Sequence, residues 1–439
     1  MKIYVMFLLL LVFGVQQSQA QSVLDRFKQK AKDRAEQRLD EGMDKALDKT
    51  EEEATKKREA KKNSETKEPA KSVSGNNEET KPEVASFKAY SRYDFVPGEN
   101  IMFAEDFSQD VIGEFPLKWA TNNRGETVTI ESLAGKWMQL FKEGHFVSPY
   151  IKNLPENFTM EFDLVLNLPP NTQNTNYADI VFRLMEIEPG DEKARRFFNE
   201  NFEAKADIKV ILSPFPEEGS SVSLFSTQGG NNQTYFSKEG KELRNMQTLL
   251  RKPIHFAIWI QKERFRLWMN GEKIYDIPQA VPENARFNRI EFQTEGSPYT
   301  DEELGYYISN IKLAQGTPDM RSKLLTEGRL VTNGILFDVN SDKIKGESAG
   351  VLNEIAKVLK ENPSVKVKII GHTDSDGDAA KNLDLSKRRA AAVKEALAKE
   401  YGIDATRMQW DGLGKSKPVA DNATKEGKAQ NRRVEFIKL

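Results

Sequence analysis

The sequence of 439 residues contains no cysteine and only three histidines, and its formal net charge is −2. The absence of cysteine excludes disulfides, thiolate metal sites and attachment of a lipid to a cysteine. The histidines, His145, His255 and His372, lie too far apart in the sequence to suggest a metal site. The balanced charge gives no overall attraction to nucleic acid, and no basic patch is interleaved with aromatic residues. We therefore expect neither a metal cofactor nor a nucleic-acid partner.

Long apolar runs are also nearly missing. One run, residues 3–14, follows Met1-Lys2 and precedes the small residues Ser18-Gln19-Ala20. A short basic start, an apolar stretch and a small-residue cleavage site are typical of a secretory signal peptide, which we place at 1–20. The run is too short to span a membrane comfortably, so we expect an exported chain whose mature form has no transmembrane segment.

The next segment is dominated by charge. Residues 21–84 contain 16 basic and 16 acidic side chains. Within 21–60 a thin apolar stripe runs from Leu24 and Phe27 through Leu39 and Met43 at steps of three and four, which predicts a charged amphipathic helix. Such a helix is a solvated spacer or a self-associating coiled coil. Residues 61–84, rich in Lys, Glu, Ser and Asn, predict a disordered linker.

Residues 85–316 have the texture of a β domain. Period-two patterns predict strands over 158–166, 180–187, 208–212, 221–225, 254–260, 264–269, 290–292 and 306–311. The dipeptide Asn270-Gly271 predicts a tight hairpin turn into 273–275. Many short strands separated by Gly, Pro and Asn turns favour an all-β, jelly-roll-like sandwich.

Two segments, Phe103 to Phe107 and Phe115 to Trp119, together with the Asn270-Gly271 hairpin, resemble the concanavalin A-like lectin/glucanase sandwich. That resemblance implies a glycan-binding or glycan-hydrolysing domain. The carboxylate array of such glucanases is incomplete, because Leu166 follows Glu161 and Asp163 where a second Glu is needed, and we interpret the two carboxylates as a solvated strand face. Four tryptophans are either core residues or sugar-stacking platforms: Trp119, Trp137, Trp259 and Trp268. An Asn-rich loop at 171–176 with Asp179 is an ordinary polar loop or a calcium site.

The C-terminal third carries the most specific pattern. Residues 365–370 predict a strand, and the motif Gly371-His372-Thr373-Asp374 follows it directly. Residues 386–399 predict a helix that carries Arg389. Asn382 lies seven residues before Arg389 and faces the same side if the helix includes it. A carboxylate and a guanidinium on neighbouring elements can receive a ligand with both an ammonium and a carboxylate group.

These motifs, with Gly334 to Ser341 as first strand and turn, Leu385-Ser386 before Arg389-Ala390, Gly412 to Lys415, and Asn431 to Glu435, resemble the OmpA-like C-terminal domain. The resemblance covers about 325–439 and implies an α+β (βαβαβ-type) fold that binds peptidoglycan. It also implies that Asp374 takes the ammonium, and Arg389 the carboxylate, of a diaminopimelate residue in the stem peptide. Asn340, Asn382 and Arg432 match other positions that line the family's pocket.

The residues by themselves leave simpler interpretations open. Without the family context, Asp374 and Arg389 are interpreted as a structural ion pair, Asn382 as a helix cap and Arg432 as a charge on a strand surface. His372 is expected to be a packed structural residue, because no nucleophile or second histidine accompanies it.

The chain is thus predicted to be a multidomain, non-catalytic envelope protein. We expect a signal peptide (1–20), a charged helix (21–60), a linker (61–84), a β-sandwich (85–316) and a peptidoglycan-binding domain (317–439). The protein is predicted to sit in the periplasm of a Gram-negative envelope, bound to the wall and associated with the outer membrane. Two alternatives remain: a glycan-active sandwich merely localised by the C-terminal domain, and a scaffold whose sandwich binds other envelope proteins.

Overall fold

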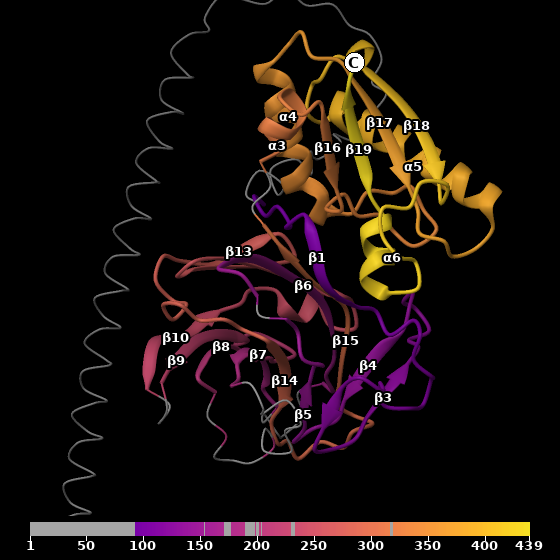
Figure 1. Cartoon of the computed structure of the whole chain (residues 1–439). Helices are drawn as coiled ribbons and strands as arrows, with labels where there is room; N and C mark the ends of the chain where they lie inside the picture. The colour runs from indigo at the N-terminus through magenta and orange to yellow at the C-terminus, as the bar shows by residue number, and fades with distance from the viewer. Residues whose placement is uncertain are drawn as a thin grey trace, which may run out of the picture. The chain divides into compact units, whose positions relative to one another are not determined.

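The structure is a computed structural model that describes residues 93–152, 154–170, 177–188, 198, 202, 204–229, 233–316 and 319–439 (Figure 1). The described residues all belong to one unit of the chain, Val84–Leu439. The predicted signal peptide, charged helix and linker, and the Asn-rich loop at 171–176, lie outside the described residues.

The sandwich region consists of two antiparallel sheets (Figure 1). The first has the order β13-β12-β11-β6-β15-β4-β3, with β1 also paired to β15, and the second has the order β10-β9-β8-β7-β14-β5-β2. The strands are β1 (Asn100–Glu105), β2 (Ala120–Thr121), β3 (Gly125–Val128), β4 (Trp137–Leu140), β5 (His145–Val147), β6 (Asn157–Asn167), β7 (Ile180–Glu186), β8 (Ala206–Ser213), β9 (Ser221–Gln228), β10 (Thr234–Glu242), β11 (Ile254–Gln261), β12 (Arg264–Met269), β13 (Glu272–Ile277), β14 (Arg289–Thr294) and β15 (Gly305–Gln315), with a 3-10 turn at Met246–Thr248.

Alternating side chains of the two sheets meet in one apolar core. Phe162 of β6 stacks on Phe256 of β11 with ring centroids 4.9 Å apart, and both Phe182 and Phe292 of the second sheet contact Phe162. The predicted hairpin at Asn270-Gly271 is confirmed, because both residues adopt positive φ, of 46° and 83°, between the paired strands β12 and β13. Every strand predicted within 85–316 is present. The strands β1 to β5 and β10 were not predicted, because β2 to β5 are short, β10 is polar, and β1 has consecutive apolar residues without an alternation.

The prediction that Glu161 and Asp163 form a solvated strand face is wrong. Both carboxylates are buried, and His255 of the neighbouring strand β11 lies between them, with Nδ1 2.7 Å from Asp163 and Nε2 3.6 Å from Glu161. The outer face of this sheet is covered, because Tyr93 and Phe95 pack there against Trp268 and Ala257. The alternating polar residues Glu161 and Asp163 therefore lie in a buried polar layer and not on a solvent-exposed face.

The C-terminal region is a four-stranded sheet with helices, in the order β16-β19-β17-β18 (Figure 1). Strands β17 and β18 are parallel, and β19 is antiparallel to β16 and β17. The elements are α3 (Met320–Leu325), β16 (Arg329–Thr332), α4 (Ala349–Glu361), β17 (Val367–His372), α5 (Ala379–Lys399), β18 (Met408–Gly414), α6 (Lys425–Asn431) and β19 (Val434–Lys438), with 3-10 turns at Gly346–Ser348 and Ala405–Arg407.

Several bounds in this region differ from the prediction: β17 lies at Val367–His372 and not at 365–370, and α5 begins at Ala379 and not at 386. The first strand was expected within 334–341, but it lies at Arg329–Thr332, where Leu330 is buried and the backbone pairs with β19. Residues 334–341 instead form an irregular segment that ends in a turn, closed by the Ser341 amide donating to the Asp338 carbonyl. Asn340 has φ 54° in this turn, a left-handed conformation that Asn tolerates better than most residues.

The segment before β1 joins the two apolar cores. Val96 belongs to the same core cluster as Leu330, Val351 and Phe436, whereas Phe95 packs with Trp268 of the sandwich. A Cβ on Gly350 of α4 would lie 2.1 Å from the Phe95 carbonyl oxygen, so only glycine fits there. Residues 95 and 96 thus contribute to the core of the sandwich and to the core of the C-terminal region. The division of the chain into two domains at residue 316 therefore remains a proposal.

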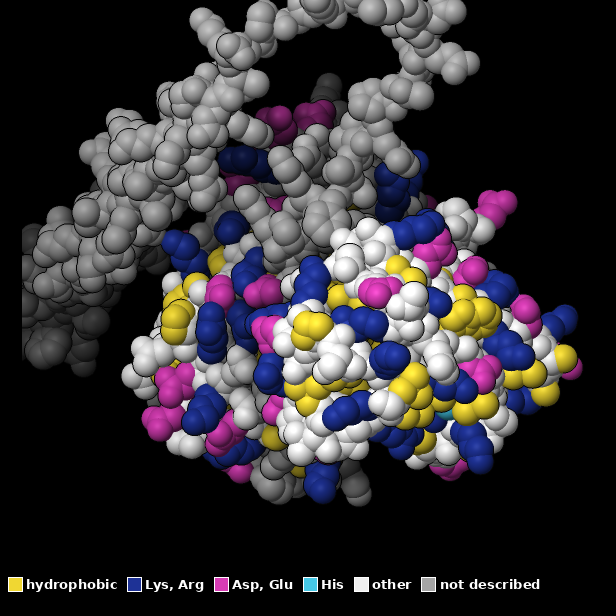
Figure 2. Space-filling model, turned by 90° about the horizontal axis from the view of Figure 1, so that it is seen from above, with side chains coloured by type: hydrophobic (Ala, Val, Ile, Leu, Met, Phe, Trp, Pro, Cys, Tyr) yellow, Lys and Arg dark blue, Asp and Glu magenta, His cyan; other side chains and the backbone are white. Residues whose placement is uncertain are grey.

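Within the described part of the chain, no helix is long and apolar enough to cross a membrane. On the face that Figure 2 shows, Lys and Arg side chains are spread over the surface with Asp and Glu side chains among them.

Candidate functional site

Two glycines set the distance between helix α5 and the sheet beneath it. A Cβ on Gly371 of β17 would lie 2.3 Å from the Ser386 carbonyl oxygen, and a Cβ on Gly412 of β18 would lie 2.3 Å from the Lys387 amide nitrogen. The Ser386 hydroxyl also accepts a hydrogen bond of 2.9 Å from the Gly414 amide. Because α5 can approach both strands this closely, its residue Arg389 is held in a fixed position relative to the end of β17.

Asp374 lies two residues beyond β17 and is the acidic centre of the site. Its Oδ2 accepts a hydrogen bond of 2.8 Å from Nη1 of Arg432, and its Oδ1 accepts one of 3.1 Å from the Asp376 amide. The Asp374 side chain is 13 % exposed and that of Arg432 is 42 % exposed. The carboxylate is thus partly covered, while the arginine that pairs with it reaches solvent.

Arg389 is held by the turn that precedes α4. Its Nε donates to the Ser341 carbonyl at 2.9 Å and its Nη2 donates to the Asp338 carbonyl at 3.4 Å. The guanidinium lies 4.8 Å from the ring centre of Phe337, a cation–π contact. These contacts fix the plane of the guanidinium, and within the described residues no hydrogen bond engages its Nη1.

The three charged groups influence one another. Burial lowers the pKa of Arg389, Arg388 and Arg432 lower it further, and Asp374 acts in the opposite direction. The guanidinium groups of Arg389 and Arg432 and the carboxylate of Asp374 therefore interact electrostatically, with one positive charge in excess. This arrangement suits a ligand that brings a carboxylate of its own.

The other two predicted residues lie nearby in different roles. Asn382 lies within helix α5, is 9 % exposed, and donates from Nδ2 to the Asp376 carbonyl at 2.7 Å. Its interpretation as a cap is wrong, because Asp378 is the N-cap and accepts from the Ala380 and Lys381 amides. Asn340 is exposed, in the same turn whose carbonyls hold Arg389.

Arg432 is not a charge on a strand surface. It follows helix α6 and precedes β19, and its guanidinium crosses to Asp374. The structure therefore brings Asp374 and Arg432 into direct contact, places Arg389 in their field, and puts Asn382 behind the loop that follows Asp374.

Several residues that support this loop were missed as site residues by sequence reasoning. Lys428 of α6 pairs with Asp376 at 2.8 Å, and Asn422 accepts a hydrogen bond of 3.0 Å from the Ser375 amide. Lys415 donates to the Ser375 and Gly377 carbonyls. Lys415 lies within one of the motifs named above, Gly412 to Lys415, but the spacing of a motif does not show which distant loop a side chain will hold.

His372 is a buried structural residue, as expected. Its Nε2 lies 3.2 Å from Oε1 of Glu435 on β19, and Arg329 and Arg433 also bind this carboxylate. Burial raises the pKa of Glu435, but these three partners outweigh it and hold the pKa well below its usual range. The cluster ties β17 to β19 directly below the site.

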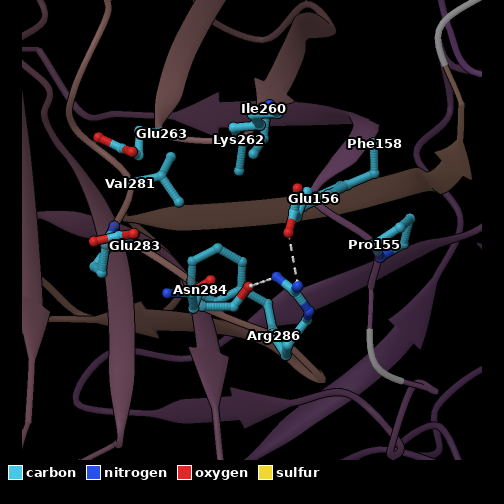
Figure 3. Close-up of a pocket in the computed structure, with 13 residues that line it drawn as sticks. Pro155, Glu156, Phe158, Ile260, Lys262, Glu263, Val281, Glu283, Asn284 and Arg286 are labelled. Carbon is cyan, nitrogen blue, oxygen red and sulfur yellow. Dashed lines mark hydrogen bonds and ion pairs between the residues drawn. The ribbon is translucent and has the colours of Figure 1, made fainter.

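A surface pocket of about 230 Å³ lies in the sandwich (Figure 3). Its charged groups include Glu156 and Arg286, which already pair at 2.8 Å. Lys262, Glu263 and Glu283 complete a rim of mixed charge around Phe158 and Val281. The pocket is lined by sandwich residues only and takes no part in the Asp374 site.

Comparison with known proteins identifies the class of this domain. The model of the OmpA family matches residues 336–432, which include Asp374, Arg389, Asn382, Asn340 and Arg432. The chain therefore contains an OmpA family domain at its C-terminal end.

Known relatives match a limited share of the chain. The chain is 48% identical over 144 residues to the probable lipoprotein YiaD of Escherichia coli, which covers 30% of this chain and 63% of that protein. It is 46% identical over 101 residues to outer membrane porin F of Pseudomonas aeruginosa, covering 23% of this chain and 29% of that protein. A crystal structure of the peptidoglycan-associated lipoprotein from Burkholderia pseudomallei is 34% identical, with a TM-score of 0.23, covering 24% of this chain and 88% of that chain. The chain thus spans less than two thirds of the length of these curated relatives. The family match begins at residue 336 and does not include the sandwich. The resemblance of the sandwich to the concanavalin A-like fold stays a prediction.

Proposed function

We propose that this protein is a non-catalytic anchor of the Gram-negative envelope that binds peptidoglycan non-covalently through its OmpA family domain. The observation that carries the proposal is the cluster of Asp374, Arg389 and Arg432 on a domain of this family. The name of the Burkholderia relative, a peptidoglycan-associated lipoprotein, supports the same ligand. The protein is exported to the periplasm and links the wall to whatever its sandwich binds.

The ligand in this proposal is the diaminopimelate residue of a stem peptide. Its ammonium group approaches Asp374, whose carboxylate accepts charge-assisted hydrogen bonds, and its carboxylate approaches the free side of the Arg389 guanidinium. Arg432, which contacts Asp374 and acts electrostatically on Arg389, provides a second positive charge for the ligand's carboxylate. Asn382 and Asn340 shape the loops that hold these groups.

The sandwich is proposed to be an interaction domain and not a hydrolase. Glu161 and Asp163 are buried and engaged by Lys312, Asn310 and His255, so neither is available to attack or protonate a glycan. Trp119, Trp137 and Trp268 are buried in the structure, and Arg266 covers Trp259 at 3.9 Å from its ring centre. These positions favour packing over sugar stacking.

Sedimentation of the exported full-length chain with purified sacculi tests the anchor. We expect Asp374→Ala and Arg389→Ala each to abolish co-sedimentation, because truncating one partner of a charged contact costs about 2–5 kcal/mol. Arg321→Ala is the control, since this arginine of α3 is exposed and pairs with Glu361. Undiminished binding by the Asp374→Ala/Arg389→Ala double variant would rule out this site as the anchor.

A further inference from the structure

Helix α6 lies beside strand β1 of the sandwich (Figure 1). Arg432, the residue directly after this helix, contacts Asp374. Strand β1 pairs with β15 along one edge, so its other edge presents unpaired amides. Two of these are satisfied by side chains of α6: the Ile101 amide donates to Gln430 at 3.1 Å and the Ala104 amide donates to Glu426 at 3.2 Å. Gln430 in turn donates to the Glu99 carbonyl at 3.2 Å.

A buried ion cluster reinforces the same contact. Lys425, whose side chain is 9 % exposed, pairs with Glu105 at the end of β1 and with Asp110 at 2.9 Å. Glu105 is 3 % exposed and also accepts a hydrogen bond from the Phe107 amide. Because a buried charge without its partner is strongly destabilising, these groups fix the first turn of α6 against the sandwich.

The opposite side of α6 faces the ligand site. Lys428 and Arg432 are four residues apart and reach Asp376 and Asp374, while Glu426 and Gln430, also four apart, reach β1. The two pairs lie on different sides of one short helix. Any shift of α6 away from β1 therefore moves the Arg432 guanidinium relative to Asp374.

The loop after β1 comes close to the same arginine. Burial raises the pKa of Asp106, but hydrogen bonds from Ser108 and the positive charges of Arg432 and Lys425 lower it on balance. A sandwich carboxylate thus lies within the field of Arg432. The sandwich contributes to the electrostatic surroundings of the site as well as to the position of α6.

We propose that the sandwich edge is a working part of the wall-binding site, with Glu426, Gln430 and Lys425 acting as positioning residues that hold Arg432 beside Asp374. This inference rests on the proposed function, because it assigns the sandwich a role in binding the diaminopimelate ligand. By thermodynamic reciprocity, bound ligand also strengthens the contact between α6 and the sandwich. A partner that displaces β1 from α6 weakens wall binding.

The test is isothermal titration of the full-length exported chain with a soluble muropeptide that carries a meso-diaminopimelate stem. Glu426→Ala/Gln430→Ala removes both acceptors of the β1 amides and leaves Lys428 and Arg432 in place, and we expect about 10-fold weaker binding. Glu395→Ala/Lys399→Ala, which removes an exposed pair on the distal end of α5, is the control and should bind like the unchanged chain. Equal affinity of the Glu426/Gln430 variant and the unchanged chain would overturn the proposal.

A double-mutant cycle with Arg432→Ala separates positioning from general loosening. If Glu426 and Gln430 act through Arg432, adding their substitutions to Arg432→Ala causes no further loss of affinity. Fully additive losses would contradict the coupling.

Hydrogen exchange distinguishes failure of the coupling from failure of the proposed function. The Ile101 and Ala104 amides should lose protection in the Glu426/Gln430 variant, and we expect the Ser375 and Asp376 amides to exchange faster with them. If the unchanged chain binds no muropeptide, the proposed function fails, and the exchange at 375–376 still decides the coupling. Fast exchange at 101 and 104 without any change at 375–376 would refute it.

Discussion

At the scale of single residues, the site depends on the shape of a guanidinium as much as on its charge. Arg389 uses one side of its planar group for the Ser341 and Asp338 carbonyls and stacks on Phe337, which leaves its other side for a ligand. The positions of Asp374 after a strand and of Arg389 on the following helix were predicted from the sequence, because the strand and helix patterns next to them are regular. The contact between Asp374 and Arg432 was not predicted as an ion pair, since 58 residues separate the two and no local period links them.

The first prediction concerns this planar geometry. Arg389→Lys keeps the charge but cannot hold two carbonyls and a ligand carboxylate at once. We expect at least about 10-fold weaker muropeptide binding by titration, with a circular dichroism spectrum like that of the unchanged chain. Binding equal to that of the unchanged chain would show that charge alone suffices.

At the scale of elements, two close contacts decide the architecture. Helix α5 rests on the bare backbone of β17 and β18, and β6 pairs with β11 around the buried cluster of Glu161, Asp163 and His255. The strands of the sandwich were predictable because inward apolar residues recur at period two. The burial of the polar face of β6 was not, because the period shows which residues share a face but not what covers that face.

The closeness of α5 gives the second prediction. Gly371→Ala places a Cβ 2.3 Å from the Ser386 carbonyl oxygen, a backbone atom that cannot move without shifting the helix. We expect a loss of about 1–3 kcal/mol in the free energy of unfolding, measured by urea titration, and weaker muropeptide binding. Gly377→Ala meets open space but adopts positive φ, so it reports the cost of backbone strain alone. A Gly371 variant as stable as the unchanged chain would contradict the packing described here.

The buried cluster gives the third prediction. Burial lowers the pKa of His255, but hydrogen bonds and charge from Asp163 and Glu161 raise it to about 10. Burial raises the pKa of Glu161, but Lys312 and His255 lower it to about 2. Lys345 also acts on Asp163, and Glu161 and Glu347 act on Tyr93, so groups on both sides of the covered face take part.

The direction in which folding stability changes with pH follows from the direction of each pKa shift. A raised histidine pKa contributes stability that is complete below about pH 6.5 and is lost as the pH rises toward 10. The lowered pKa of Glu161 contributes stability above about pH 4.5 that is lost as the pH falls toward 2. Urea unfolding between pH 5 and 10 should show falling stability above about pH 6.5 in the unchanged chain and a flatter profile in His255→Gln. Parallel profiles would exclude His255 as the titrating group.

At the scale of the whole molecule, the described residues form one unit in which the two apolar cores share the segment around Phe95 and Val96. Sequence patterns predicted a β-rich region followed by an OmpA-like region, and they assigned this segment to the sandwich alone. The contact of α6 with β1 was equally hidden, because Glu426 and Gln430 read as ordinary surface residues until the fold brings them to a strand edge. Contacts between regions depend on partners that no local pattern records.

The central claim, recognition of diaminopimelate by the Asp374 site, is tested most directly by comparing two stem peptides. The full-length exported chain is titrated with a peptide that carries meso-diaminopimelate and with the same peptide carrying lysine, which keeps the ammonium but lacks the second carboxylate. We predict binding of the first, at least about 10-fold weaker binding of the second, and loss of this discrimination in Arg389→Ala. Equal affinity for both peptides, or discrimination that survives Arg389→Ala, would contradict the account.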